Sequence, residues 1–224
     1  MIIKNDQDIF FGLDQAAIDE LGLYKTVNTY KKNQAIFLQD NPAYGVYCIQ
    51  SGKVKISSVG KEGKETILRL ASAGELLGHT TIFSNEAYTA SAVAMEDCVV
   101  CYLEKEKFLK AVAKYPMLTL NIMSQLSHTM RASEAQNVAL AQKNVRERFA
   151  ALLLKFIETY GAKVGERVRL DIKLTRDEMA SMIGTSMETL VRLITEFKNE
   201  GIIEQDGKVI FIIDEKKLVQ FANI

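Results

Sequence analysis

Residues 174–201 read LTRDEMASMIGTSMETLVRLITEFKNEG and contain two helical patterns that meet at Gly184. Thr175 and Glu178 have the three-residue spacing of a capping box, so a first helix is predicted to begin directly after Thr175. Gly184 then allows a turn, because a glycine adopts a positive φ at little cost. The stretch therefore predicts two helices joined by a tight turn.

The second helix of this stretch has two unlike faces. Thr185 and Ser186 are candidate caps at its start, and Gly201 stands where a helix-ending glycine is expected. Its apolar residues recur at helical spacing and predict a buried face: Leu190, Leu193, Ile194 and Phe197. Its polar residues lie on the opposite face: Glu188, Arg192, Thr195 and Asn199.

This arrangement is typical of a helix-turn-helix, whose second helix enters the major groove of DNA. Glu188 and Arg192 are four residues apart, so both side chains can reach base edges from one face. Arginine can donate two hydrogen bonds to guanine, and glutamate can accept one from cytosine. The alternative is an ion pair on a solvated helix, which is worth only about 0.2–0.5 kcal/mol.

A hairpin is predicted directly after these helices. Residues 202–213 read IIEQDGKVIFII, in which two apolar strand patterns flank Asp206 and Gly207. An Asp-Gly pair between such runs is a strong signal for a two-residue hairpin turn. A hairpin after a recognition helix corresponds to the wing of a winged helix-turn-helix, so this order favours double-stranded DNA as the partner.

Composition argues against several classes of protein. No run approaches 18 apolar residues and the N-terminus lacks the pattern of a signal peptide, so we expect a cytoplasmic protein with no membrane partner. The 28 basic and 28 acidic residues give a net charge of zero, and residues 144–224 contain 13 of each. DNA binding must then depend on a few placed contacts rather than on a basic surface.

The three cysteines are Cys48, Cys98 and Cys101. Cys98 and Cys101 have C-x-x-C spacing, but the residues around them read as a strand, in which positions i and i+3 point to opposite faces. Small buried residues are therefore favoured over a redox or metal pair. Three cysteines cannot supply the four thiolates of an iron–sulfur cluster within one chain.

Residues 26–103 have the texture of a β-roll. Short β-prone runs alternate with Gly and Asn at spacings of about 8–12 residues, which favours a jelly-roll, or double-stranded β-helix. Residues 1–25 carry a helical pattern that is expected to cap the roll. Residues 74–83 read GELLGHTTIF, and the N–H groups of such a segment can bind an anion; the alternative is an ordinary turn and short helix.

Pro116 opens the longest helical pattern, which extends to Lys143 and would be roughly 40 Å long. Its residues repeat at sevens, as in a coiled coil, and the seam becomes polar in its C-terminal half. This length favours the seam of a homodimer over a helix buried on its own domain. The predicted seam residues are Met123, Leu126, Met130, Ser133, Asn137 and Leu140.

A second capping box, formed by Asn144 and Glu147, marks the start of the next helix. After it the pattern predicts a helix to Gly161, a short strand pair before Thr175 and a closing helix over the last eleven residues. The predicted fold is therefore α+β in three parts. A β-roll domain covers residues 1–115, a dimerisation helix covers 116–143, and a winged helix-turn-helix domain covers 144–224.

This order of parts resembles the CRP/FNR family of bacterial transcription regulators over nearly the whole chain, most specifically in GTSMETLVRLITEFKNEGII and GELLGHTTIF. The resemblance implies an effector-binding roll, a homodimer that reads a palindromic operator, and RNA polymerase as a further partner; it implies no enzyme. Glu188 and Arg192 match the family's base-reading pair, whereas Met187 replaces an arginine of the cyclic-AMP receptor. The implied DNA contacts are Thr175, Thr185, Ser186, Met187, Glu188, Thr189, Arg192 and Thr195.

The effector site departs from the family's cyclic-AMP pattern, in which a glutamate binds the ribose and an arginine about ten residues later binds the phosphate. His79 and Tyr88 stand in these places, and no Arg or Lys occurs between residues 71 and 104. A buried phosphate without a charged partner is costly, so we expect no tight binding of cyclic AMP. Ser133 matches a threonine that meets the nucleotide base. The implied effector pocket comprises Gly78, His79, Thr80, Tyr88, Thr89, Ser133 and Asn137.

The effector and any cofactor stay open at this point. Haem is one candidate, because some relatives sense haem-bound gas and His79, His128, Cys48 or a methionine can supply an axial ligand. A redox-responsive regulator, an unidentified small molecule and no effector at all are the others. A cupin-type metal enzyme shares the roll but needs clustered histidines, and the two here are 49 residues apart. A third class is a sensor or adaptor whose winged domain binds protein, which the neutral charge allows.

Overall fold

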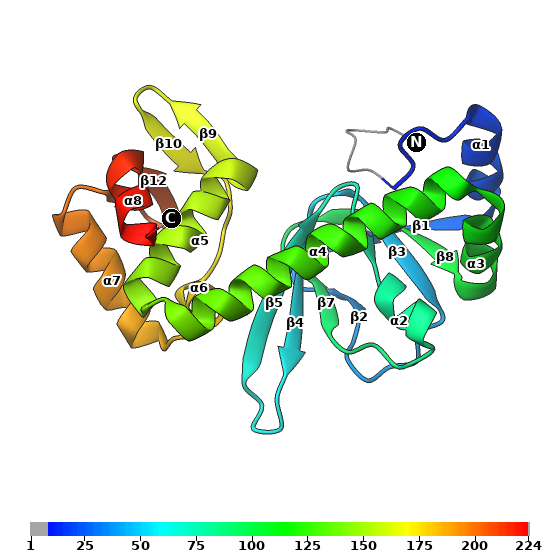
Figure 1. Ribbon diagram of the computed structural model, residues 1–224, viewed down its shortest axis with the longest axis horizontal. Coiled ribbons are helices and arrows are strands. Elements are labelled where there is room, and N and C mark those ends of the chain that lie inside the picture. Colours follow the sequence, from blue (N-terminus) through cyan, green and yellow to red (C-terminus); the bar gives the residue numbers. More distant parts are fainter. Residues whose placement is uncertain (1–8, 224) are drawn as a thin grey trace. The chain divides into compact units, whose positions relative to one another are not determined.

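The computed structural model describes residues 9–223 (Figure 1). The chain divides into two compact units, Met1–Ala132 and Ser133–Ile224. The division falls inside helix α4 (Pro116–Gln142), so the last turns of this helix belong to the second unit. The predicted long helix is confirmed with Pro116 as its first residue. The three domain boundaries proposed from the sequence stay a prediction.

The first unit is built on a jelly-roll of two four-stranded antiparallel sheets, as predicted. One sheet has the order β1-β8-β3-β6 and the other the order β2-β7-β4-β5. The strands are β1 (Lys25–Tyr30), β2 (Ala35–Phe37), β3 (Gly45–Ser51), β4 (Lys53–Val59), β5 (Glu65–Ser72), β6 (Leu76–Leu77), β7 (Ser91–Ala94) and β8 (Cys98–Glu104).

Three further helices accompany the roll: α1 (Gln15–Tyr24), α2 (His79–Ser84) and α3 (Lys105–Lys114). The helix predicted over residues 1–25 is wrong in part, because residues 9–12 form a turn and α1 begins only after its cap, Asp14. The Asp14 carboxylate accepts from the Ala17 N–H at 2.7 Å, which fixes that start. Residues 1–8 lie outside the described part of the chain.

The β1-β8-β3-β6 sheet separates two apolar clusters. Ile49, Leu77, Cys98 and Val100 face the interior of the roll, whereas Val46, Cys48, Leu76, Cys101 and Leu103 face residues of α1, α3 and the start of α4. Cys98 and Cys101 therefore lie on opposite faces, as the strand period predicts. Cys48 is the residue paired directly opposite Cys101 on the neighbouring strand.

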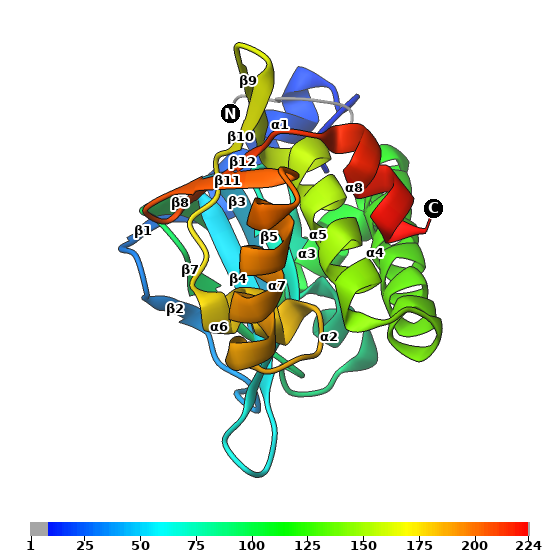
Figure 2. The same cartoon turned by 90° about the vertical axis from the view of Figure 1, so that its left-hand side faces the viewer.

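The second unit is a winged helix-turn-helix, also as predicted (Figure 2). Its sheet is antiparallel and has the order β11-β12-β10-β9. Its elements after α4 are α5 (Val145–Tyr160), β9 (Gly161–Val164), β10 (Arg167–Leu170), α6 (Arg176–Met182), α7 (Met187–Asn199), β11 (Ile203–Asp206), β12 (Val209–Ile212) and α8 (Glu215–Ala222).

The hairpin of the wing differs from its prediction by one residue. Asp206 pairs with Val209, so the two loop residues are Gly207 and Lys208 rather than Asp206 and Gly207. Only Gly207 of this loop has a positive φ, of 55°, which fits a type II′ turn better than the type I′ turn that Asp-Gly suggests. The Asp-Gly signal therefore found the hairpin but misplaced its register.

Aromatic rings form the centre of the second unit. The Phe197 ring of α7 lies 5.0 Å from that of Phe149 on α5 and 5.8 Å from that of Phe221 on α8, centre to centre. This packing anchors the helix that carries the candidate DNA contacts. Among the described residues, no helix is long and apolar enough to span a membrane.

Candidate nucleic-acid interface and effector region

The helix-turn-helix begins with the predicted capping box. The Thr175 hydroxyl accepts from the Glu178 N–H at 3.1 Å, and the Glu178 carboxylate accepts from the Thr175 N–H at 2.9 Å. Gly184 has a φ of +64°, which a side chain would make costly. Of the two candidate caps of α7, Ser186 is the cap; its hydroxyl accepts from the Thr189 N–H at 3.2 Å.

Helix α7 presents the two faces that its sequence predicts. The apolar residues of one face are buried: Leu190, Leu193, Ile194 and Phe197. Glu188, Arg192 and Thr195 are exposed on the other, together with Met187 and Val191. The Thr195 hydroxyl donates to the Val191 carbonyl at 3.0 Å, so this hydroxyl is engaged within its own helix. Glu188 and Arg192 are therefore the long polar side chains best placed to reach a base.

The carboxylate of Glu188 turns toward the N-terminus of α7 rather than toward Arg192. Hydrogen bonds from its own backbone N–H and from Ser186 lower the pKa of Glu188, so the group is ionised at neutral pH. No ion pair joins Glu188 to Arg192 in the part of the chain that the structure describes. The ion-pair interpretation of this spacing is thus not supported.

Other arginines of the same unit are engaged with carboxylates. Arg146 pairs with Glu196 at 2.9 Å and with Glu200 at 2.7 Å, and Arg167 pairs with Glu204 at 2.8 Å. Each of these pairs places a carboxylate beside the charge of the arginine. DNA recognition by this unit must accordingly depend on placed side chains, in line with the zero net charge.

His79, the first residue of α2, is only 4% exposed. Neither of its ring nitrogens makes a hydrogen bond of ordinary geometry within residues 9–223, although the Leu76 backbone lies close enough to affect its pKa. Burial and the nearby Arg69 lower the pKa of His79 to about 4, against an opposing effect of the Leu76 backbone. The imidazole is therefore neutral at physiological pH and has unused hydrogen-bonding capacity.

Tyr88 fills space inside the roll rather than lining an open site. Its side chain is buried, its ring stacks on that of Phe37 with the centroids 4.1 Å apart, and its hydroxyl donates to the Gly45 carbonyl at 2.9 Å. A Cβ added at Gly78 would lie 2.9 Å from the Tyr88 ring, so the glycine permits this close approach. Burial beside other tyrosines raises the pKa of Tyr88.

The remaining predicted effector residues do not share this environment. Thr80 and Thr89 are exposed, and Ser133 and Asn137 are exposed on the part of α4 that belongs to the second unit. A cation lies close to His79 although residues 71–104 contain no Arg or Lys. Arg69, on β5, lies near His79 and forms an ion pair with Glu75 at 2.5 Å. No sequence signal connects a strand residue ten positions earlier with His79.

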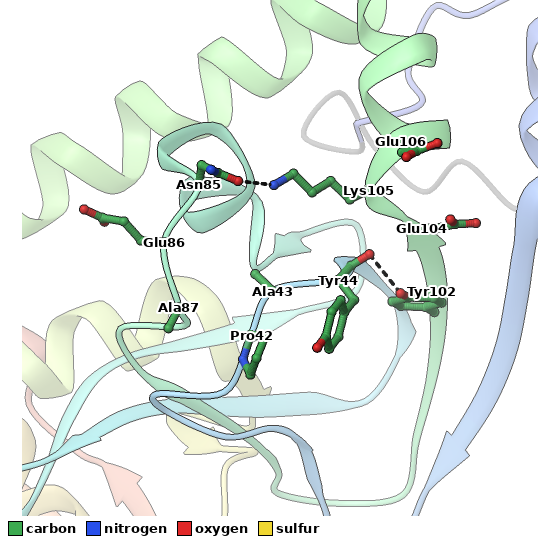
Figure 3. Close-up of a pocket in the computed structure, with 10 residues that line it drawn as sticks. All are labelled: Pro42, Ala43, Tyr44, Asn85, Glu86, Ala87, Tyr102, Glu104, Lys105 and Glu106. Carbon is green, nitrogen blue, oxygen red and sulfur yellow. Dashed lines mark hydrogen bonds between the residues drawn. The ribbon is translucent and has the colours of Figure 1, made fainter.

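A groove of about 730 Å³ opens on the surface of the roll, and its lining includes none of the predicted effector residues (Figure 3). Tyr102 donates from its hydroxyl to the Tyr44 carbonyl at 3.0 Å on one side, and Lys105 donates to Asn85 on the other. The groove is lined by Pro42, Ala43, Tyr44, Asn85, Glu86, Ala87, Tyr102, Glu104, Lys105 and Glu106. None of these residues was predicted to bind an effector.

Helix α4 leaves large apolar side chains in solvent. Met123 is 57% exposed, Met130 is 64% exposed and Leu140 is 44% exposed, as a dimer seam would require of a single chain. Leu126, another predicted seam residue, is half-buried and packs on the apolar cluster beneath the roll. Leu140 also lies beside the turn glycine, Gly184.

Known proteins match this architecture in both halves. The model of the cyclic nucleotide-binding domain matches residues 27–115, and that of the Crp-like helix-turn-helix domain matches residues 147–221. A CRP-like cAMP-activated global transcriptional regulator of Mycobacterium tuberculosis is 26% identical over 215 residues, covering 96% of each chain. The transcriptional activator protein anr of Pseudomonas aeruginosa is 27% identical over 210 residues, covering 94% of this chain and 85% of the relative.

The chain belongs to the CRP/FNR family of transcription regulators. Solved structures agree in fold. A CRP/FNR-family regulator from Thermus thermophilus is 25% identical with a TM-score of 0.72, over 89% of this chain and 99% of that one. The c-di-GMP responsive global regulator CLP of Xanthomonas campestris has a TM-score of 0.81 at 19% identity, over 90% and 100% of the two chains. These relatives are DNA-binding regulators of transcription rather than enzymes.

Proposed function

We propose that this CRP/FNR regulator acts in the cytoplasm as a homodimer that binds a palindromic DNA operator. The observation that carries the proposal is the exposed pair Glu188 and Arg192, held on the solvent face of a capped helix whose other face is buried. Arg192 donates to the O6 and N7 atoms of a guanine, and Glu188 accepts from the N4 amino group of a cytosine. Two such helices, one from each protomer, read two half-sites.

The homodimer is supported by α4. Met123 and Met130 recur at a seven-residue interval and are more than half exposed. A second copy of the helix would remove these side chains from water, which favours association of the two chains. RNA polymerase is the further partner that a transcription regulator of this family requires.

Selection of bound duplexes from a random DNA pool tests the proposal. We expect a palindrome whose half-sites lie about 34–36 Å apart, which is one turn of the double helix. Recovery of no shared sequence would contradict it. If the winged unit instead binds protein, retention on genomic DNA would not fall steeply with salt.

The effector of this regulator is proposed to be a molecule other than cyclic AMP. The Mycobacterium tuberculosis relative is named as cAMP-activated, but His79 and the buried Tyr88 occupy the places of the nucleotide-binding side chains here. Arg69 is the cation near this region, and it is already paired with Glu75. In titration calorimetry, cyclic AMP is expected to bind with a dissociation constant weaker than about 1 μM. A constant of about 1 μM corresponds to a binding free energy of about −8 kcal/mol.

A haem-responsive regulator is the second candidate. His79 favours it, because a buried neutral imidazole that makes no hydrogen bond of ordinary geometry among the described residues is suited to bind a metal centre. His79 would hold the iron, and the haem would supply gas binding. The thiols do not favour redox sensing in the same way, since burial raises the pKa of Cys98 and Cys101. A Soret band in the purified protein would support haem, and its absence after reconstitution with haem would exclude it.

A further inference from the structure

The turn between α6 and α7 is held from outside the helix-turn-helix. Inside the turn, the N–H groups of Ile183, Gly184 and Thr185 donate back into α6, at distances of 3.0–3.3 Å. The next carbonyls, of Met182, Ile183 and Gly184, lie where a helix leaves its acceptors unpaired, and they accept from side chains of α4 and α5.

Arg148, in the first turn of α5, supplies most of these partners. Its Nε donates to the Ile183 carbonyl at 2.8 Å and its Nη2 reaches the Gly184 carbonyl at 3.5 Å. Its Nη1 donates to the carbonyl of Lys143, just beyond the end of α4, at 2.6 Å. One guanidinium therefore joins the C-terminal ends of two helices, α6 and α4.

The C-terminal part of α4 also contacts the connection between α6 and α7 directly. The Gln136 side-chain amide donates to the Met182 carbonyl at 3.4 Å. A Cβ added at Gly184 would lie 2.9 Å from Cδ2 of Leu140, so the end of the Leu140 side chain packs against the turn at this glycine. These residues all belong to the second unit, and α4 is thus packed on the helix-turn-helix at the point where α7 begins.

We propose that Arg148 is a positioning residue that fixes recognition helix α7 relative to the end of α4 and so sets the half-site spacing that the dimer accepts. The inference rests on the proposed function, because the spacing of half-sites equals the spacing of two recognition helices. Arginine suits this role, since its planar fork donates in several fixed directions and its charge stabilises both helix C-termini. A lysine has one nitrogen and cannot join both helix ends in this way.

Binding to operators of altered spacing tests the role of Arg148. The duplexes carry the selected palindrome with its centre unchanged, lengthened by one base pair or shortened by one. We expect the wild-type chain to prefer one spacing by roughly tenfold or more, a difference of about 1.4 kcal/mol. Arg148→Met should reduce that preference to within about twofold, while its base preference in an isolated half-site stays that of the wild type.

Two further variants separate positioning from folding. Arg148→Lys keeps the cation at one helix end, and we expect it to fold but not to restore the spacing preference. Arg146→Lys is the matched control on the same helix; Arg146 lies over the Phe221 ring at 4.0 Å and pairs with Glu200, away from the turn. We expect Arg146→Lys to lower the melting temperature without changing the preferred spacing.

The outcomes distinguish this inference from the proposed function. Wild-type spacing preference in both folded Arg148 variants would overturn the positioning role while leaving the operator proposal intact. If Arg148→Lys restored the spacing preference, the positive charge of Arg148 would be sufficient and the geometry of its guanidinium would not matter. A wild-type chain without any preferred palindrome would remove the proposed function itself, and the inference with it.

Discussion

Helices α2 and α7 both follow a glycine in the left-handed region, yet they present opposite surfaces. Gly78 has a φ of +76° and Gly184 a φ of +64°. The residue that opens α2, His79, is buried in the roll, and no side chain caps that helix. Helix α7 is capped by Ser186 and keeps its first polar residue, Glu188, in solvent. The start of α7 therefore exposes a long polar side chain to a partner, whereas the start of α2 buries its polar side chain in the roll.

The largest effect on the free energy of unfolding is expected from a substitution on the buried face of α7. Leu190 is fully buried and its neighbour Val191 is 46% exposed. Leu190→Ala should lower the free energy of unfolding by about 2–5 kcal/mol, because it leaves a cavity. Val191→Ala should change it by less than about 0.5 kcal/mol. Urea unfolding of the two variants checks this, and equal losses would contradict the two-faced description of α7.

His79 should make the stability of the protein depend on pH. Its folded pKa of about 4 lies below the unfolded value of 6.5, so the unfolded chain takes up the proton first. The neutral imidazole therefore contributes to the free energy of unfolding fully above pH 6.5. This contribution is lost as the pH falls toward 4, and the loss at pH 4 is about 3 kcal/mol. His79→Leu should remove this part of the dependence.

The pH experiment has a matched control in the second histidine, His128, which is exposed on α4. His128→Gln is expected to leave the fold unchanged, because the side chain that it replaces is exposed. A wild-type pH profile in His79→Leu would show that the buried imidazole does not titrate as its surroundings require.

Substitution of Glu188 tests whether the exposed face of α7 reads DNA bases. Glu188→Ala should cost about 1–3 kcal/mol of discrimination at one cytosine of the operator, with only a small loss of unfolding free energy, because the side chain is exposed and its hydrogen bonds are confined to the N-terminus of α7. Competition binding with operators substituted at each position measures this. An equal loss of affinity on every operator sequence would show that Glu188 supports the structure of α7 and does not recognise a base.

The smallest of these effects is expected inside the roll. Tyr88→Phe removes the hydroxyl that donates to the Gly45 carbonyl and should destabilise the chain by about 0.5–1.5 kcal/mol. Tyr44, which is 70% exposed, is the control, and Tyr44→Phe should have no measurable effect. Thermal unfolding distinguishes the two, and equal melting temperatures would contradict the assigned role of Tyr88.

The second unit could be predicted from the sequence because its signals are local. Capping boxes at Thr175 and Asn144 and the alternating faces of α7 each depend on residues three or four positions apart. Where the prediction depended on register, it was off by one residue, at the Gly207–Lys208 loop. Propensity alone does not fix which residues of a short loop close the hairpin.

The effector region could not be predicted in the same way, because its environment is made by distant segments. The ring of Tyr88 meets Phe37 and its hydroxyl meets Gly45, about fifty and forty positions away. The periodicity of the sequence also does not predict the ion pair between Arg69 and Glu75 near His79. Arg148 was missed for a different reason: the carbonyls it holds, at Ile183 and Gly184, carry no side-chain signal.

Replacement of the operator guanine by 7-deazaguanine is the most direct measurement on the central claim, because it removes the N7 acceptor of the base that Arg192 is proposed to read. We predict that the wild-type dimer loses about 1–3 kcal/mol of affinity on this duplex and that Arg192→Ala loses nothing further from the same replacement. Equal losses for both proteins, or none for the wild type, would show that Arg192 does not read that guanine.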